Sequence, residues 1–347
     1  MIGKQFLKFT SDILNYRLEF IYKFNIITGN SATGKTTLYD AVRLELLNPT
    51  GSLECSCKCI CLDNLNWVHY LESTSTDGYL FIIDESFKYI NSKEFIRLIL
   101  HKPSYFIIIN RDSIEMLPYS VNAVYTFHKS GKYITMRSLL ESNSYSMNPI
   151  NNPDVILTED SNSGYEFFYK FSDERSLVVS TNGKSNIVGL LNSKFKDDKV
   201  FVVVDGAAFG SCLNKIMTLL RRNRNIYLFT PESFEYILLC HPYFKLTDKI
   251  LDKNYIAGTI PLTYPSWEQY FTEYLIKITS GTPFEYSKSK LNKNYITDGF
   301  INTLVSIFPE LDVYSDNHYE VKRTSLFKWY SPDTITISIK NELLTTL

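Results

Sequence analysis

The chain lacks any apolar run long enough to cross a bilayer. Of its 347 residues, 44% are hydrophobic and 21% are charged, and no uninterrupted apolar stretch approaches the ~20 residues that a membrane-spanning helix needs. The N-terminus also shows no apolar segment followed by the small-residue cleavage site of a secretory signal. These absences predict a globular protein of the cytoplasm without a membrane partner.

A surplus of either charge is missing as well. The chain has 36 Lys and Arg residues against 37 Asp and Glu residues, so its formal net charge is −1. A protein with so even a balance has no overall attraction for nucleic acid or for an anionic membrane surface. Any contact with nucleic acid must therefore come from a local patch.

Cysteine is scarce, and four of the six cysteines stand at alternate positions: Cys55, Cys57, Cys59 and Cys61. On a β-strand this alternation places all four on one face, and cysteines two apart on a strand are poor disulfide partners. Zinc ligands usually come as C-x₂-C pairs on turns. The pattern predicts a core strand at residues 56–62 with buried, reduced thiols and no structural metal. A thiolate metal site is the alternative.

What the chain does contain is a phosphate-binding signature. Residues 24–37 read FNIITGNSATGKTT, and GNSATGKT fits G-x-x-x-x-G-K-[ST] at every fixed position. An apolar strand precedes this octet, and apolar residues at helical spacing follow it. The glycines of such a loop let backbone N–H groups and the N-terminus of the next helix point at a phosphate chain. The predicted nucleotide-binding residues are Gly29, Asn30, Ser31, Ala32, Thr33, Gly34, Lys35, Thr36 and Thr37.

Two side chains of this loop have expected chemical roles. Lys35 is expected to reach the β- and γ-phosphates, and the Thr36 hydroxyl is expected to hold Mg²⁺. The alternative is a surface turn, rich in glycine and lysine, that matches the pattern by chance. The strand before the loop and the helix after it favour the nucleotide site.

A second apolar strand ends in two acids. Residues 80–85 read LFIIDE, and a buried parallel strand of this kind delivers a carboxylate to the carboxyl end of a sheet. We expect Asp84 to be a magnesium ligand and Glu85 to be the catalytic base that orients or polarises the attacking water. The alternative is a buried strand that ends in a solvated turn. The expected cofactors are ATP or GTP together with Mg²⁺.

The two motifs together resemble those of P-loop NTPases, over about residues 20–130. The consecutive Asp84 and Glu85 resemble the ABC and AAA side of that superfamily. In AAA-type and related ATPases a strand beside the magnesium-binding one ends in a polar sensor of the γ-phosphate or the water. The resemblance implies this catalytic role for Asn110, with Arg111 as added positive charge, although both are also ordinary residues for the end of a strand. The chain departs from the family in having no LSGGQ-like signature and no clear arginine-finger segment.

The chain as a whole predicts an α/β protein of two domains. Residues 1–141 are expected to form a P-loop nucleotide-binding domain around a parallel sheet. Residues 142–165, rich in Ser, Asn, Pro and Gly, are expected to be a linker with an edge strand at residues 155–158. Residues 166–347 show three strand–loop–helix units and then a helical pattern. They predict a second small parallel α/β domain with a C-terminal helical segment.

The second α/β region, about residues 170–245, is similar to a Toprim-like domain in a degenerate form. That family holds Mg²⁺ for phosphodiester chemistry with a Glu-Gly pair after its first strand and a D-x-D after a later one. Here the two positions read Asn182-Gly183 and Asp205-Gly206-Ala207. Two of the three acids are therefore missing, which favours an inactive or structural domain. The candidate acids that remain in this domain are Asp205, Glu232 and Glu235.

Two short basic segments are candidates for contact with nucleic acid. Basic residues also stabilise a helix C-terminus through its dipole, and a run of Ser, Lys and Asn is usually a solvated face. Neither segment is therefore assigned by its sequence alone. The residues concerned are Arg221, Arg222 and Arg224 in the first segment and Lys288, Lys290 and Lys293 in the second.

These observations predict a cytoplasmic protein that binds and hydrolyses ATP and whose second domain engages nucleic acid or a protein partner. A second copy of the chain is one candidate for the protein partner. ATPases joined to Toprim-type domains are common in genome-defence and mobile-element proteins, and the resemblance implies such a setting. An ATP-gated, Mg²⁺-dependent nuclease is the alternative enzyme. A nucleotide-sensing interaction module without catalysis is the alternative outside enzymology.

Overall fold

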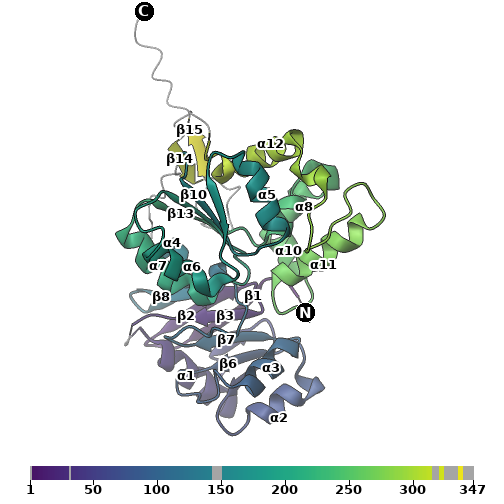
Figure 1. Cartoon of the computed structure of the whole chain (residues 1–347). Helices are drawn as coiled ribbons and strands as arrows, with labels where there is room; N and C mark the ends of the chain where they lie inside the picture. Colours follow the sequence, from purple (N-terminus) through teal and green to yellow (C-terminus); the bar gives the residue numbers. More distant parts are fainter. Residues whose placement is uncertain (1, 31–32, 143–150, 315–319, 324–334, 339–347) are drawn as a thin grey trace, which may run out of the picture. The chain divides into compact units, whose positions relative to one another are not determined.

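The computed structural model describes residues 2–30, 33–142, 151–314, 320–323 and 335–338 (Figure 1). Its internal contacts divide the chain into two compact units, which are described separately. Both are of the α/β class, as the sequence predicts, with a large and mostly parallel sheet in the first and a smaller parallel sheet in the second. Unit 1 contains Met1–Asn143, Gly206–Ser211 and Asp252–Tyr270, and unit 2 contains Ser144–Asp205, Cys212–Leu251 and Phe271–Leu347.

Unit 1 includes two segments that the sequence predicts to belong to the second domain. Gly206–Ser211 and Asp252–Tyr270 cluster with the first unit. The contact is direct, since the N–H of Gly210 donates to the carbonyl of Tyr119 at 2.8 Å. Contacts between residues so far apart in the chain leave no local pattern in the sequence.

The sheet of unit 1 has nine strands in the order β4-β1-β2-β9-β8-β3-β7-β6-β5. The five strands β8-β3-β7-β6-β5 are parallel to one another, while β4, β1 and β2 pair antiparallel. The strands are β1 (Gln5–Thr10), β2 (Asn15–Phe20), β3 (Phe24–Ile27), β4 (Leu53–Cys55), β5 (Cys59–Leu62), β6 (Leu80–Ile83), β7 (Tyr105–Ile109), β8 (Val124–Ser130) and β9 (Tyr133–Ser138).

The expected single strand at residues 56–62 is wrong, because the chain bends at Cys57. Ser56 still pairs with β1, donating its N–H to Phe6, whereas the carbonyl of Lys58 accepts from Leu80 of β6. Strands β4 and β5, which flank this bend, are thus the two edge strands of the sheet. Because only a few residues join them, the two edges of the sheet lie close together. The bend removes the regular alternation, but Cys61 still belongs to the buried core and the other three thiols of the motif pack against it.

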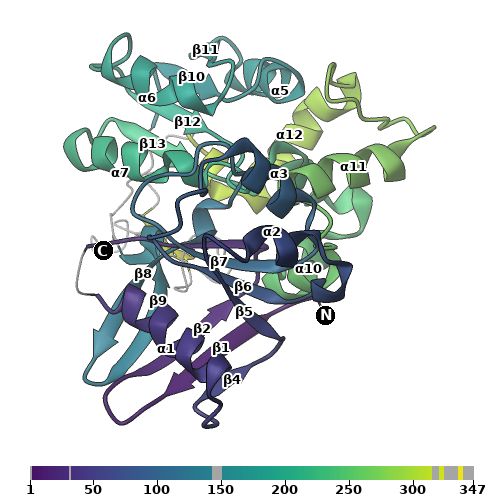
Figure 2. The same cartoon turned by 90° about the horizontal axis from the view of Figure 1, so that it is seen from below.

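Helices cover the two faces of this sheet (Figure 2). Leu38 and Val42 of the first helix pack into the core on one face. On the other face the rings of Phe24, Phe81 and Phe106 lie in contact, with neighbouring centroids 5.4 Å apart. The helices of unit 1 are α1 (Lys35–Leu47), α2 (Trp67–Glu72), α3 (Lys93–His101), α4 (Leu139–Ser142) and α10 (Lys253–Thr259).

Unit 2 is built on four parallel strands in the order β11-β10-β12-β13. Strand β10, expected at an edge within the linker, is an inner strand that pairs with β11 and β12. All four of its residues are buried, which is typical of a central parallel strand. The elements of this sheet and its connections are β10 (Val155–Thr158), α5 (Ser163–Ser172), β11 (Leu177–Ser180), α6 (Lys184–Asn192), β12 (Val200–Val203), α7 (Leu213–Arg222), β13 (Ile226–Phe229) and α8 (Phe234–Leu239).

Figure 1 shows α6 and α7 together on one side of this sheet and α5 and α8 on the other. The rings of Phe167 in α5 and Phe234 in α8 are 5.4 Å apart. The described chain from residue 261 to residue 311 is mainly helical, as expected, whereas the two strands that follow it were not predicted. The division between the two units falls inside α11. The remaining elements are α9 (Thr247–Leu251), α11 (Trp267–Thr279), α12 (Asp298–Ile307), β14 (Glu320–Arg323) and β15 (Ile335–Ser338).

Candidate functional site

The carboxyl ends of three adjacent parallel strands bring the motif residues of unit 1 together. Strand β7 lies between β3 and β6. In the register of the sheet Ile27 is opposite Ile109, and Ile83 is opposite Ile108. Asp84, the next residue, is thus level with the last residues of β3 and β7. Neighbouring strands are ~4.8 Å apart, so the phosphate loop and Asp84 share one edge of the sheet.

The phosphate loop leaves β3 and enters α1 through two glycines with positive φ. Gly29 has φ +116° and Gly34 has φ +90°, a backbone region that favours glycine. A Cβ atom at Gly34 would lie 2.9 Å from Oη of Tyr16, which itself donates a 2.8 Å hydrogen bond to the Gly34 carbonyl. Strand β2 therefore fixes the start of α1. Two of the predicted loop residues, Ser31 and Ala32, lie outside the described residues.

The N-terminus of α1 presents backbone N–H groups. Lys35 is the first residue of the helix, no described side chain caps this end, and the first turn has no acidic residue. Thr36 and Thr37 are exposed. The first N–H groups of any α-helix have no partner within the helix, and together with the helix dipole they attract an anion.

Lys35 is folded back onto its own loop. Its Nζ donates to the carbonyls of Gly29 at 2.8 Å and Asn30 at 2.6 Å, and to Oγ1 of Thr33 at 3.1 Å. The pKa of this amine is lowered, first by burial and then by the positive charge of Arg111. The ammonium thus holds the loop closed with bonds that a phosphate chain could replace.

Asp84 follows a fully buried strand and is itself only 7% exposed. Its Oδ2 accepts from the N–H of Ser86 at 3.3 Å. Its buried Oδ1 has no hydrogen-bond partner among the residues that the structure describes. Leaving a buried carboxylate oxygen unpartnered is costly, and a bound cation would offset that cost.

The donor set at this sheet edge fits Mg²⁺ better than a metal held by protein alone. Within the described ranges, no group of three or more His, Cys, Asp or Glu side chains is arranged to hold a metal ion. Magnesium usually takes one or two carboxylates, with phosphates and waters completing its octahedron. Asp84 supplies one such carboxylate at this end of the strands.

Glu85 and Arg111 form an ion pair beside the loop. Nε of Arg111 lies 2.8 Å from Oε1 of Glu85. The guanidinium also lines an open cavity of about 520 Å³ together with Thr28, Gly29 and Asn30, a size within the usual range for small-molecule sites. Arg111 thus places a positive charge next to the phosphate loop, and its ion pair holds the Glu85 carboxylate beside that charge.

Asn110, expected to be the polar sensor, has another partner in this structure. Its side-chain amide donates to the carbonyl of Asp112 at 2.8 Å. Arg111, the next residue, is the one that reaches Glu85 and the cavity. The sequence offered only the position of both residues after a buried strand, which does not determine the direction of either side chain.

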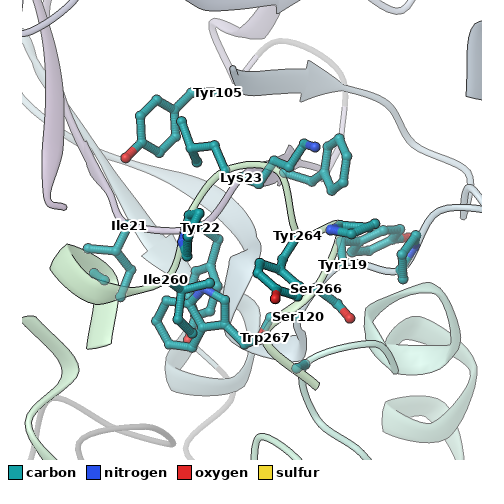
Figure 3. Close-up of a pocket in the computed structure, with 17 residues that line it drawn as sticks. Ile21, Tyr22, Lys23, Tyr105, Tyr119, Ser120, Ile260, Tyr264, Ser266 and Trp267 are labelled. Atoms are coloured by element: carbon teal, nitrogen blue, oxygen red, sulfur yellow. The ribbon is translucent and has the colours of Figure 1, made fainter. Parts of the chain in front are cut away.

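A second cavity of unit 1 is too small for a nucleotide. It has a volume of about 20 Å³, which is room for about one water molecule. Figure 3 shows Lys23, Tyr119, Tyr264 and Trp267 around it. Nζ of Lys23 donates to the carbonyl of Leu100 at 2.7 Å, and burial lowers the pKa of Lys23 to about 7. We therefore place the candidate site at the phosphate loop.

The candidate acids of unit 2 follow the carboxyl ends of its strands. Oδ1 of Asp205 accepts from the N–H of Phe234, the first residue of α8, at 2.9 Å. Glu159, which the sequence pattern did not single out, follows β10, and its Oε2 accepts from the N–H of Asp205 at 3.3 Å. Recognising β10 as an inner strand would have revealed this acid.

The other two candidate acids of unit 2 are buried. Glu232 is 1% exposed. Glu235 is 2% exposed, and its Oε1 accepts a 2.8 Å hydrogen bond from the hydroxyl of Tyr286, which also contacts Ser163. This arrangement gives Glu235 a structural partner inside the unit.

The two basic segments lie at opposite ends of the strands in the sheet of unit 2. Arg221 and Arg222 form the last turn of α7, and Arg224 follows before β13 begins, at the amino edge. The segment with Lys288, Lys290 and Lys293 lies against the start of α5, because the carbonyl of Lys288 accepts from Ser163 at 3.4 Å. A single nucleic-acid strand along one edge would thus meet only one of the two segments.

No helix in the described part of the chain combines the length and the apolar character needed to span a bilayer. Comparison of the chain with models of protein families, with curated proteins and with solved structures finds no match. The functional assignment therefore rests on the geometry of the site.

Proposed function

We propose that unit 1 binds a nucleoside triphosphate with Mg²⁺ and hydrolyses it, as a member of the P-loop NTPases. The observation that carries the proposal is the buried Oδ1 of Asp84, which has no hydrogen-bond partner among the described residues and lies at the same end of the strands as the phosphate loop. A buried carboxylate oxygen without a hydrogen bond is expensive for the fold, and no described side chain caps the nearby N-terminus of α1. A nucleotide with its cation would satisfy both.

The position of β7 between the phosphate-loop strand and the acidic strand supports this assignment. The resemblance to AAA-type and related ATPases implies a strand beside the acidic strand that ends in a polar sensor of the terminal phosphate or the water. Arg111, directly after β7, lines the cavity beside the loop.

The residues of the site would have different roles in hydrolysis. The N–H groups of α1 would hold the phosphates, and Lys35 would exchange its loop carbonyls for phosphate oxygens. Thr36 and Asp84 would hold Mg²⁺, which neutralises charge on the phosphates. Glu85 would accept a proton from the attacking water as the water oxygen bonds to the terminal phosphorus. The bond from that phosphorus to the bridging oxygen breaks, which releases the diphosphate.

Mg²⁺–ATP binding by Lys35→Ala tests this proposal. We expect binding of the triphosphate to weaken at least tenfold, because hydrogen bonds from a charged donor are among the strongest in proteins. Lys93→Ala is the matched control, since Lys93 is also the first residue of a helix, but Ser92 caps that helix. Equal binding by Lys35→Ala and Lys93→Ala would refute the phosphate-loop assignment.

For unit 2 we propose an interaction role, with nucleic acid or a protein as the partner. Two basic segments on its surface support it. A rate of ATP hydrolysis that rises when single- or double-stranded DNA or RNA is added would select nucleic acid. An unchanged rate would favour a protein partner and a nucleotide-sensing module.

A Mg²⁺-dependent nuclease is the second candidate for unit 2. The contact between Glu159 and the backbone of Asp205 favours it, because it brings two carboxylates to the carboxyl edge of the sheet. Cleavage of DNA or RNA that requires Mg²⁺ and is lost in both Glu159→Gln and Asp205→Asn would support the nuclease. Absence of cleavage by the parent would exclude it.

A further inference from the structure

The bend in the cysteine-rich segment changes what Cys55 and Cys57 can do. On a straight strand the Cα atoms of residues two apart are separated by about 6.8 Å, which is the upper limit for a disulfide. Here β4 ends at Cys55, and the chain bends at Ser56 and Cys57 before β5 begins. A bend shortens the distance between the residues on either side of it. It therefore moves this pair toward the separation of ~5.5–6 Å that disulfides favour.

Ser56, between the two cysteines, fixes the bend to the neighbouring strand. Its N–H donates to the carbonyl of Phe6 at 3.1 Å, and its hydroxyl donates to Oε1 of Gln5 at 2.7 Å. The hydroxyl also accepts from the N–H of Phe6 at 3.0 Å. Both the main chain and the side chain of Ser56 are thus bound to β1. The cysteines that flank it are held near each other, which favours a reaction between them.

The two thiols are partly exposed and interact with each other. The side chains of Cys55 and Cys57 pack against the same hydrophobic cluster of unit 1. The thiol of Cys57 donates a hydrogen bond to the sulfur of Cys55, which lowers the pKa of Cys55 to about 7 against the opposing effect of burial. The thiolate, and not the thiol, is the nucleophile in disulfide exchange. Cys55 is therefore the reactive member of the pair.

We propose that Cys55 and Cys57 are a redox-active dithiol that exchanges with low-molecular-weight disulfides. This site is separate from the candidate nucleotide site. Cys59, the first residue of β5, is opposite Leu80, the first residue of β6, whereas Asp84 follows the last residue of β6. The cysteine bend thus lies at the other end of the parallel strands from the phosphate loop, and the inference does not depend on the proposed function.

The exchange proceeds in two steps. The Cys55 thiolate attacks one sulfur of the small disulfide, so that a bond from Cys55 to that sulfur forms, the original S–S bond breaks and one small thiolate leaves. The released thiolate takes the proton of Cys57. The sulfur of Cys57 then attacks the sulfur of Cys55, which forms the internal disulfide and releases the second small thiolate. The two cysteines lose two electrons, and the small disulfide gains them.

The pKa of Cys57 sets the order of these steps. It is raised by the hydrogen bond to Cys55, by burial and by the charge of Cys55, so Cys57 keeps its proton while Cys55 is a thiolate. In the mixed disulfide Cys55 has no negative charge, and its two effects are lost. The pKa of Cys57 then falls, and Cys57 becomes the second nucleophile. Burial raises the pKa of Cys59 and of Cys61, so these two thiols stay protonated.

The first test exposes the full chain to mixtures of oxidised and reduced glutathione and then alkylates the free thiols. Trypsin cleaves after Arg43 and Lys58 and releases residues 44–58, which contain both members of the pair, from the peptide with Cys59 and Cys61. We expect the peptide of residues 44–58 to escape alkylation in oxidised glutathione, to carry an internal disulfide, and to become fully alkylated again after excess reduced glutathione is added.

Three results of this test would overturn the proposal. The first is a peptide of residues 44–58 that stays alkylated in every mixture. The second is a disulfide that links this peptide to Cys59 or Cys61. The third is an oxidised form that excess reduced glutathione does not reverse, because exchange with a small disulfide runs in both directions.

The second test uses single substitutions to separate the two roles. Cys57→Ser keeps a hydroxyl that can donate to Cys55 but lacks the second nucleophile, so it is expected to stop with one glutathione on Cys55. Cys55→Ser is expected to take up glutathione on Cys57 at least ~3-fold more slowly at pH 7, because a thiol of ordinary pKa holds less thiolate there. Cys59→Ser is the matched control and should form the internal disulfide as the parent does. Equal rates in Cys57→Ser and Cys55→Ser would refute Cys55 as the attacking thiol.

Discussion

Asp84 carries a carboxylate oxygen that the fold does not use, and this has a cost. The buried Oδ1 has no hydrogen-bond partner among the described residues, whereas Oδ2 accepts from Ser86. Functional sites commonly keep such groups at the expense of stability. The side chain should therefore contribute to the binding of a ligand and lower the stability of the protein without one.

Asp84→Asn is expected to change folding stability and nucleotide binding in opposite directions. Removing the charge should raise the free energy of unfolding by roughly 1 kcal/mol, the low end of the cost of a buried unsatisfied group. Affinity for Mg²⁺–ATP should fall by ~10-fold or more, because even outer-shell partners of a metal are worth that much. Chemical unfolding without nucleotide and a binding titration measure the two effects.

Asp63→Asn serves as the control for this change. Oδ1 of Asp63 accepts from the N–H groups of Leu65 and Asn66 at 2.9 and 3.0 Å, so its carboxylate is structural and the same change should lower stability. A loss of stability in Asp84→Asn as large as that in Asp63→Asn would show that Asp84 also serves the fold.

Lys23 should make unit 1 more stable as the pH rises. Burial lowers its pKa from 10.5 to about 7, so between these two values the unfolded chain binds more protons at this site than the folded chain. The stability contributed by this group therefore increases from pH ~7 to ~10.5. Lys23→Met is expected to flatten that rise.

Thermal unfolding of the parent and Lys23→Met from pH 6 to 10 checks the effect of Lys23. Lys93→Met provides the control, since it makes the same substitution at a lysine that is exposed. A pH-independent difference between the parent and Lys23→Met would show that the amine of Lys23 titrates as in the unfolded chain.

At the residue scale, the sequence predicts those features of the site that depend on residue type and spacing. Gly34 could be anticipated because the loop needs a positive φ there, and the structure has φ +90°. The Arg111–Glu85 pair could not be anticipated, because a long side chain at the end of a strand has many rotamers. Its direction is set by neighbours from another strand.

At the scale of elements, Asp205 links strand β12 to helix α8. Its Oδ1 accepts from the N–H of Phe234, where the helix begins. Asp205→Ala is expected to cost about 1 kcal/mol, as the loss of a capping acceptor does, whereas Asp205→Asn keeps an acceptor and should cost less. Chemical unfolding measures this difference.

The same pair of variants tests the independence of the two sheets. ATP hydrolysis should stay within ~2-fold of the parent in both, since positioned catalytic groups are worth far more than that. A cleavage activity of unit 2, if present, should be lost in both, because a metal ligand needs the charge. A tenfold fall in ATP hydrolysis would contradict the separation of the two sites.

Sequence periodicity predicted the positions of strands in the chain better than it predicted which strands pair with one another. The run at residues 80–83 is a buried parallel strand, as predicted. The bend at Cys57 and the inner position of Val155–Thr158 were missed. Both depend on which strands pair, and pairing is decided by long-range packing that a local pattern does not contain.

At the scale of the whole molecule, the short segment Gly206–Ser211 interrupts the sequence of unit 2 and packs with unit 1. A Cβ atom at Gly210 would lie 2.3 Å from the ring of Tyr119 and 2.5 Å from its carbonyl oxygen. Such distances require movement of the backbone. Only glycine permits this approach.

Gly210→Ala is expected to lower the free energy of unfolding by about 2 kcal/mol or more, as overpacking does. Gly189→Ala is the control: a Cβ there meets no atom within 4 Å, and Gly189 lies within α6, where alanine is favoured by ~0.5–1 kcal/mol. The two changes should thus move stability in opposite directions. A Gly210→Ala protein as stable as the parent would contradict the packing of this segment.

The central claim is that the phosphate loop and the acidic strand end form a hydrolytic nucleotide site in which Lys35 and Glu85 have different tasks. In the proposed site Lys35 would neutralise phosphate charge in both the ground state and the transition state, so Lys35→Ala should lose binding and turnover together. Glu85 would act on the water, so Glu85→Gln should bind ATP about as tightly as the parent while turnover falls by ~10²-fold or more.

The most direct test is to measure the dissociation constant for Mg²⁺–ATP and the hydrolysis rate at saturating ATP for the parent, Lys35→Ala and Glu85→Gln. The account predicts weak binding in Lys35→Ala and tight binding without turnover in Glu85→Gln. Parental hydrolysis by Glu85→Gln would exclude Glu85 as the base, and parental binding by Lys35→Ala would contradict the nucleotide site itself.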